Sequence, residues 1–295
     1  MTASAAQPGP PRRTTVAGLA ALAAGQDDLP TVVMLPGYTG SKEDFAPVLP
    51  LLAAAGLRAV AVDLRGQYES VADADEPDSQ FAIDALAADV ALAAAQLGTR
   101  VHLVGHSFGG LVARAALIAH PAAIASVVLL GSGPAAIVGP RGLALHAMFA
   151  LYRQAGRAGV WEGVRAIDTT VRPPAEAEFL RQRFFASSER GMLAMGEALL
   201  AEPDRVADAA AAAAAHAIPL LVTHGVGDDA WPPAMQADMA TRLGARYAVI
   251  PDALHSPAAQ NPAGTADVLV GFVRDAVAGS STETLPACEA TAEVS

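Results

Sequence analysis

The sequence is poor in cysteine and in aromatic residues. It contains one cysteine, Cys288, so no disulfide within the chain and no cysteine-based metal site can form. Such cysteine usage is typical of a reducing compartment. Aromatic residues make up 5% of the chain while 53% of all residues are hydrophobic, so a core must be built mostly from Ala, Val and Leu.

Positive charge is also scarce. The chain has 19 Lys and Arg against 30 Asp and Glu, a net charge of −11. An acidic surface repels nucleic acid and anionic lipid, so we expect neither as a partner. The densest basic stretch lies between residues 181 and 190 and includes two phenylalanines. We interpret it as one face of an amphipathic helix, with a stacking site for nucleic acid as the alternative.

Long apolar runs are missing as well. No run of 18 or more apolar residues free of charge and turn signals occurs, so the sequence predicts no membrane span. Arg12-Arg13 before VAGLAALAAG resembles a twin-arginine export signal, but the apolar run is short and the usual flanking residues are absent. We therefore interpret TTVAG and LAALAAG as a β-hairpin and predict a cytoplasmic protein, with export as the alternative.

Short β-rich runs alternate with longer stretches rich in Ala and Leu. This alternation predicts an α/β fold, with a mostly parallel sheet flanked by helices. The predicted strands span residues 31–36, 58–63, 100–105, 125–131, 218–225 and 245–251. The predicted helices span residues 42–55, 80–97, 108–119, 207–217, 232–243 and 262–278.

The alternation stops between Pro134 and about Arg205, where the pattern is helical and is broken by Gly and Pro. A helical insertion of this kind predicts a lid over a site. We therefore divide the chain into an α/β core and a lid: residues 12–133 and 207–279 form the core, and residues 134–206 the lid. Residues 1–11 and 280–295 are small, polar and rich in Pro, Ser and Thr, which predicts disordered tails.

A G-x-S-x-G pentapeptide, Gly105–Gly109, joins an apolar strand pattern to a helix pattern. A tight turn at this junction exposes Ser107 and requires small residues two positions before and after it. The start of the helix adds backbone N–H groups and the positive end of the helix dipole. The pattern predicts Ser107 as a nucleophile; the alternative is a glycine-rich turn with an incidental serine.

A serine nucleophile needs a base, and the base needs an acid that orients it. Asp228 and His255 each follow a predicted strand directly, and Ser107 does so too. Ligands collect at the carboxyl ends of strands in open α/β sheets. We therefore predict that the three side chains converge, with His255 as base and Asp228 as acid.

Five segments together resemble the α/β-hydrolase family, in its serine-nucleophile branch with a helical lid, over roughly residues 14–279. They are LPGYTGSKEDF, AVDLRGQYES, VGHSFGG, VTHGVGDDAWPP and PDALHSPAAQNP. The resemblance implies that the backbone N–H groups of Tyr38 and Phe108 hold the oxyanion. It also implies Asp228 rather than Asp229 as the acid, because the family's acid comes three positions after the glycine that closes the strand. Asp252 is the reserve candidate.

Other polar residues have simpler interpretations. We expect His102, His106 and His120 to be structural, and His224 to brace the loop that carries Asp228. We also interpret the strand-end turn Asp63–Gly66 as structural. No His, Asp and Glu cluster has metal-ligand spacing, and no G-x-G-x-x-G loop follows a strand, so neither a metal nor a cofactor is predicted.

The serine narrows the chemistry, because dehalogenases and epoxide hydrolases of this fold use aspartate at that position. The apolar lid pattern favours a hydrophobic acyl or alkyl group, with Trp161, Phe184 and Phe185 as substrate contacts. We predict a serine hydrolase that cleaves a carboxylic ester, thioester or lactone of a small hydrophobic molecule through an acyl-enzyme. The alternatives are a carbon–carbon bond hydrolase or perhydrolase with the same triad, and a ligand-binding member without catalysis.

Overall fold

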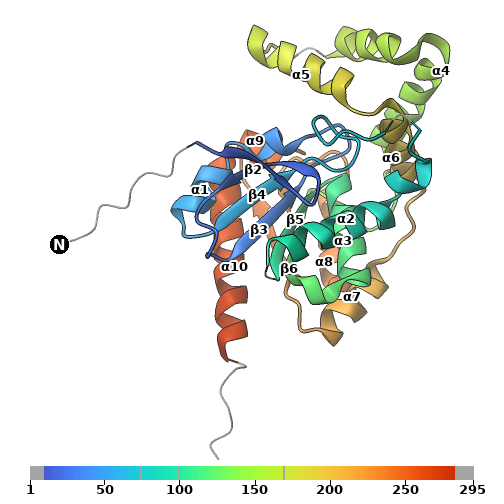
Figure 1. Cartoon of the computed structure of the whole chain (residues 1–295). Helices are drawn as coiled ribbons and strands as arrows, with labels where there is room; N and C mark the ends of the chain where they lie inside the picture. Colours follow the sequence, from blue (N-terminus) through green and yellow to red (C-terminus); the bar gives the residue numbers. More distant parts are fainter. Residues whose placement is uncertain (1–9, 74, 99, 169, 283–295) are drawn as a thin grey trace, which may run out of the picture.

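The computed structural model describes residues 10–73, 75–98, 100–168 and 170–282. The centre of the fold is one eight-stranded sheet (Figure 1). Its strand order is β1-β2-β4-β3-β5-β6-β7-β8. The strands are β1 Arg12–Val16, β2 Leu19–Ala24, β3 Thr31–Leu35, β4 Arg58–Val62, β5 Val101–His106, β6 Ile124–Leu130, β7 Leu220–Gly225 and β8 Arg246–Ile250. Strands β3 to β8 run parallel to one another. At one edge, β2 pairs antiparallel with β4, and β1 pairs antiparallel with β2. The predicted α/β class is confirmed.

The predicted strands are all present, with ends that differ by at most two residues. The predicted N-terminal hairpin is also present: β1 and β2 pair directly and are joined at Ala17 and Gly18, whose φ angles are +49° and +84°. Two successive residues with positive φ make the kind of two-residue turn that matches the twist of paired strands. The segment with Arg12 and Arg13 is therefore an edge strand of the sheet.

Helices cover both faces of the central strands, so the residues of β3, β5 and β7 are buried on both sides. Alternate residues of β3 divide between two cores: Val33 and Leu35 join the core with α2 and α3, and Val32 and Met34 join the core with α1 and α10. The helices outside the 139–201 segment are α1 Leu49–Ala54, α2 Ile83–Gln96, α3 Phe108–Ala119, α7 Val206–Ala215, α8 Pro233–Leu243, α9 Pro257–Gln260 and α10 Pro262–Thr282. Short 3-10 turns are η1 Lys42–Phe45, η2 Asp78–Phe81 and η3 Pro121–Ala123.

The predicted tail 280–295 is wrong in its first three residues, because α10 continues through Thr282. Small polar residues lower helix propensity without stopping a helix, and the next proline comes only at position 286. The rest of this tail, with Cys288, and residues 1–9 lie outside the described residues.

Between β6 and α7 the chain forms α4 Gly139–Ile167, α5 Pro174–Ala186 and α6 Glu189–Ala201, and no described residue of this segment is in a strand, as predicted. The chain bends within α4 at Gly156, where φ is +64°. In Figure 1, α5 and much of α4 stand apart from the sheet, whereas α6 lies against the core. Leu145 and Phe149 of α4 and Met195 and Leu199 of α6 are buried in that core. None of the described helices combines the length and the apolar character that crossing a bilayer requires.

A buried histidine makes the stability of this fold depend on pH. His102 of β5 is 4% exposed, and its Nδ1 lies 2.9 Å from the Ser126 hydroxyl of β6. Burial and the charge of Arg100 lower its pKa from 6.5 to about 4. The unfolded chain thus takes up a proton near pH 6.5 and the folded chain only near pH 4. The free energy of unfolding should therefore fall by up to about 3 kcal/mol as the pH drops from 7 to 4.

The variant His102→Gln keeps a polar side chain toward Ser126 but removes the titrating group. Urea unfolding of both proteins at pH 7 and pH 4 measures the effect. The loss of stability between the two pH values should be smaller in the variant by about the amount that this histidine contributes. The same loss in both proteins would show that His102 does not cause it.

Candidate active site

Ser107 lies at the junction of β5 and α3, with φ +53° and ψ −117°. Residues with a side chain rarely adopt this conformation, and the flanking glycines allow it here. A Cβ atom at Gly105 would overlap the carbonyl oxygen of Gly109, and one at Gly109 would lie 2.5 Å from the carbonyl oxygen of Leu35. The G-x-S-x-G pattern therefore corresponds to a tight turn that only small residues can complete.

Two loops bring a histidine and a carboxylate to this serine. His255 follows β8, and its Nε2 lies 3.0 Å from Ser107 Oγ. Asp228 follows β7, and its Oδ1 lies 3.0 Å from His255 Nδ1. The backbone N–H of Gly227 donates to the carbonyl of Ala253, which ties the two loops together. The three residues that the sequence singled out thus form one chain of hydrogen bonds.

The carboxylate of Asp228 is fully buried and well supplied with donors. Besides contacting His255, Oδ1 accepts the N–H of Ala230 at 2.9 Å, and Oδ2 accepts Nε2 of Gln236 at 3.0 Å. Burial raises the pKa of this carboxyl, but the bonds from His255, Ala230 and Gln236 outweigh it and hold the pKa below its ordinary value. Asp228 is therefore an anion at neutral pH.

The two other candidate carboxylates lie elsewhere. Asp229 is exposed and pairs with Arg141 of α4 at 2.8 Å. The contact with Arg141 lowers the pKa of Asp229. Asp252 is exposed on a turn, with φ +51°. Of the three carboxylates, Asp228 is the one that contacts His255.

His106 and His224 support the loops around the site. His106 does not bond Ser107; its Nε2 donates to the carbonyl oxygen of His255 at 2.7 Å. Burial and the nearby His255 lower the pKa of His106 to about 4, so it is neutral at pH 7 and keeps this bond. His224 Nδ1 donates to the carbonyl of Gly225, just before the Asp228 loop, and its Nε2 accepts from the Tyr247 hydroxyl. These contacts agree with a structural role for His106 and with a bracing role for His224.

Ser107 and His255 border a cavity of about 570 Å³. Its apolar wall comes largely from the segment between β6 and β7: Leu145, Met148, Val164 and Ile167 of α4 and Leu199 of α6. Two ion pairs, Arg141–Asp229 and Arg183–Asp44, add charged groups to the same cavity. The space beside the serine is thus apolar on one side and charged in two places.

The three aromatic residues expected to contact substrate pack against one another. The ring of Trp161 lies 5.4 Å from that of Phe184 and 6.0 Å from that of Phe185. None of the three lines the cavity of Ser107. Phe184 lines a small neighbouring cavity of about 40 Å³, which shares Tyr38 and Met148 with the larger one.

The backbone N–H groups of Tyr38 and Phe108 make no hydrogen bond with any described residue. Phe108 is the first residue of α3, so its N–H has no partner within the helix. The loop of Tyr38 lies beside the serine, because a Cβ at Gly37 would lie 3.4 Å from Ser107 Cβ. Both N–H groups are therefore free to bind a ligand near Ser107.

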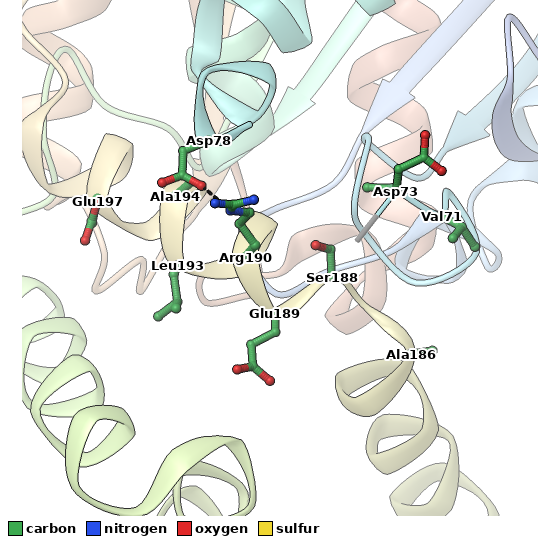
Figure 2. A pocket seen from close by; sticks show the side chains of 11 residues that line it. Val71, Asp73, Asp78, Ala186, Ser188, Glu189, Arg190, Leu193, Ala194 and Glu197 are labelled. Carbon is green, nitrogen blue, oxygen red and sulfur yellow. Dashed lines mark ion pairs between the residues drawn. The ribbon is translucent and has the colours of Figure 1, made fainter. Parts of the chain in front are cut away.

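A second cavity of about 620 Å³ lies between the loop before η2 and helix α6 (Figure 2). It is lined by the acidic side chains of Asp73, Asp78, Glu189 and Glu197, and Arg190 pairs with Asp78 at 2.6 Å. It contains neither Ser107 nor His255. Within the described part of the chain, no group of three or more His, Cys, Asp or Glu side chains is arranged to hold a metal ion.

Two buried glutamines beside the site were not predicted from the sequence. Gln236 of α8 holds Asp228, and Gln67, in the turn after β4, donates to the carbonyl oxygens of Gly37 and Tyr38. No motif points to either residue. Gln67 lies within the segment AVDLRGQYES, but its burial, which marks it as a supporting residue, is known only from the structure.

The family pattern of the α/β hydrolase fold matches residues 30–262. The chain therefore belongs to the α/β-hydrolase family, and it is an enzyme, a hydrolase. A carboxylesterase of the ammonia-oxidizing thaumarchaeon Nitrososphaera gargenis superposes with a TM-score of 0.71 at 17% identity, over 92% of this chain and 100% of that chain. An enol-lactonase from Burkholderia xenovorans LB400 superposes with a TM-score of 0.67 at 23% identity, over 90% and 100%. At these identities the two structures support the fold alone.

A sequence relative from Variovorax paradoxus (strain S110) carries the provisional name carbamate hydrolase RutD. It is 38% identical over 109 residues, which are 37% of this chain and 40% of the relative. The chain thus aligns with less than half of that relative's length.

Proposed function

We propose that this hydrolase cleaves carboxylic esters, including thioesters and lactones, of small hydrophobic molecules through an acyl-enzyme on Ser107. The observation that carries the proposal is the chain of two 3.0 Å hydrogen bonds from Ser107 through His255 to the buried Asp228. This arrangement supplies a nucleophile, a base and a group that orients the base.

In the proposed reaction, His255 Nε2 takes the proton of Ser107 Oγ as the oxygen attacks the ester carbonyl. The N–H groups of Tyr38 and Phe108 hold the oxyanion of the tetrahedral intermediate. His255 then gives the proton to the departing alcohol, and Ser107 keeps the acyl group. Water, activated by the same histidine, releases the acid and restores the serine. Asp228 holds His255 in one tautomer and stabilises its positive charge.

The substrate class follows from the cavity. Leu145, Met148 and Leu199 form an apolar wall beside Ser107, which suits an acyl or alkyl group. The names of the carboxylesterase and the enol-lactonase both refer to ester bonds, in line with this choice. A carbamate is a second candidate, because the 109-residue match is to a protein named for that substrate.

Residues 134–206 act as a lid in this proposal, and residues 12–133 and 207–279 form the core. The support for the lid is that α4 and α6 supply most of the apolar wall of the cavity. The proposal also includes a cytoplasmic location. Removal of an export signal here would take away β1, which pairs with β2 over its whole length.

A panel of substrates tests the function. We expect turnover of p-nitrophenyl esters of graded chain length, and of a thioester, by the wild-type protein. A p-nitrophenyl carbamate, a vinylogous diketone and peracid formation from acetate with peroxide serve as comparisons. Faster turnover of the diketone than of the esters would indicate a carbon–carbon bond hydrolase instead of an esterase. Faster peracid formation would indicate a perhydrolase. Tight binding without any turnover would indicate a ligand-binding protein.

The same panel tests the wall of the lid. Phe184→Ala should enlarge the small cavity next to Met148 and Tyr38, so KM for long-chain esters should change by several-fold while KM for the acetate ester stays within about twofold. Trp161→Ala is the matched control, since this ring packs against Phe184 without lining either cavity. Equal changes for short and long esters in Phe184→Ala would assign this ring to packing within the lid.

A further inference from the structure

Gln67 is fully buried beside the site and has no part in the reaction described above. Its Nε2 donates to the carbonyl oxygen of Gly37 at 2.8 Å and to that of Tyr38 at 3.1 Å. Its Oε1 accepts the backbone N–H of Leu64 at 3.1 Å. The amide nitrogen of Gln67 therefore donates to the loop of Gly37 and Tyr38, and its amide oxygen accepts from the turn after β4.

The direction of this amide is determined by its partners. If oxygen and nitrogen were exchanged, the oxygen would face two carbonyl oxygens and the nitrogen would face an N–H group. Only the observed orientation satisfies all the groups, which are buried. The two donors of Gln67 thus point at the loop of Gly37 and Tyr38.

The carbonyl of Gly37 and the N–H of Tyr38 belong to the same planar peptide group, on opposite sides of it. A hydrogen bond that holds the carbonyl therefore also sets the direction of the N–H. The same carbonyl accepts the N–H of Gly40 at 3.1 Å, so it is held by two donors. Glycine at position 37 permits a wide range of backbone angles, and without these bonds the peptide is free to rotate.

The far end of the loop is held independently. The N–H of Lys42 donates to Asp63 Oδ1 at 2.7 Å, and Lys42 Nζ lies 2.8 Å from Asp63 Oδ2. Loss of the Gln67 bonds would therefore leave the peptide between Gly37 and Tyr38 held by the N–H of Gly40 alone, while the rest of the loop stays attached to the end of β4. The effect of Gln67 should be local to that peptide.

We propose that Gln67 is a positioning residue that directs the N–H of Tyr38 toward the oxyanion formed on the carbonyl attacked by Ser107. This inference rests on the proposed function, in which Tyr38 is one of two oxyanion donors. Because the oxyanion exists in the transition state and not in the bound ester, the contribution of Gln67 appears in the chemical step rather than in substrate binding.

A purely structural role would have another signature. Gln67 also lies in the turn between Leu64 and Ser70, and any change there is able to lower stability. The matched control is Ser70→Ala: the Ser70 hydroxyl is buried in the same turn, accepts the N–H of Ala20 and donates to the carbonyl of Asp63, but does not touch the loop of Gly37.

The test compares Gln67→Met, which has similar length and no donor, with Ser70→Ala and the wild type. Each protein is assayed with a p-nitrophenyl ester. Inhibition of each protein is measured with two ketones of the same alkyl chain length. The trifluoromethyl ketone forms a tetrahedral adduct with the serine, and this adduct carries an oxyanion. The methyl ketone binds in the same site but forms far less of this adduct. Thermal unfolding of all three proteins is measured alongside.

In Gln67→Met we expect kcat/KM to fall by about ten- to a hundredfold, since loss of one whole oxyanion donor costs about 10²- to 10³-fold. The inhibition constant of the trifluoromethyl ketone should rise by the same factor, and that of the methyl ketone should stay within about twofold. Ser70→Ala should change stability without changing the ratio of the two inhibition constants. If Gln67→Met does not fold, Gln67→Asn, whose amide is one methylene shorter, should give the same pattern.

An unchanged ratio of inhibition constants in a folded Gln67 variant would overturn the inference, whatever happens to stability. If the wild type hydrolyses the ester in that case, the proposed function stands and only the role of Gln67 is lost. If the wild type neither hydrolyses the ester nor forms the trifluoromethyl ketone adduct, the proposed function fails and the inference fails with it.

Discussion

Ser107→Ala should leave a folded protein in which ester turnover has fallen by about a millionfold. Loss of the nucleophile of a serine hydrolase has an effect of this size, because the base and the acid cannot act without it. The substitution removes one oxygen, and Ala fits the backbone conformation of the turn no worse than Ser. Turnover of the p-nitrophenyl ester, with circular dichroism of the same samples, measures the two parts of this expectation.

A fluorophosphonate probe gives an independent readout of the same residue. The wild type should be labelled at Ser107, and the alanine variant should not be labelled. Ser132 is the control, because its buried hydroxyl has no hydrogen-bond partner among the described residues and therefore no base to activate it. Labelling that persists in Ser107→Ala, or turnover within a hundredfold of the wild type, would remove Ser107 from the proposed role.

Asp228→Asn should lower kcat by about 10⁴-fold. The carboxylate accepts the proton on Nδ1 of His255 at 3.0 Å, and an amide at this position favours the wrong tautomer and leaves the imidazolium without a counter-charge. The surrounding donors make the change more severe, because the N–H of Ala230 and the amide of Gln236 also point at this carboxylate. Pre-steady-state and steady-state ester hydrolysis by the variant measure the loss.

Asp229→Asn is the matched control for this prediction. Asp229 is next in the chain but exposed and paired with Arg141, so its loss should change kcat by less than about tenfold, or about 1.4 kcal/mol. Asp252→Asn should also have a small effect, since that side chain is exposed on a turn. A crippled Asp229 or Asp252 variant beside an active Asp228 variant would refute the assignment.

Much of the fold was predictable because its parallel strands are covered on both faces. Such strands appear as short continuous apolar runs, and β3, β6 and β7 are recognisable in this way. The ends of helices and strands were less predictable, because a helix continues as long as its backbone hydrogen bonds can form, and small polar residues do not prevent them. The small polar residues before Thr282 gave no sign that α10 includes them.

The proposed site was predictable to the extent that its residues lie in short motifs. Ser107 occurs in a pentapeptide whose glycines are required by the turn itself, and Asp228 and His255 follow strands directly. The walls of the cavity were not predictable to the same extent. Trp161 and Phe185 have the same apolar character as Leu145 and Leu199, yet only the last two line the space beside Ser107. Helical periodicity shows which residues are apolar, but not which neighbour each one faces.

Three features follow from the sequence alone: the order of strands and helices along the chain, the tight turn at Ser107, and an acid and a histidine at strand ends. These features depend on neighbouring residues in the chain, so local sterics and apolar patterning are enough to specify them. The contacts of Gln67 with the peptide of Gly37 and of Gln236 with Asp228 depend on the packing of the folded chain. In each case the amide finds its partner on another element of the fold, and which buried donor meets which acceptor depends on how the elements pack.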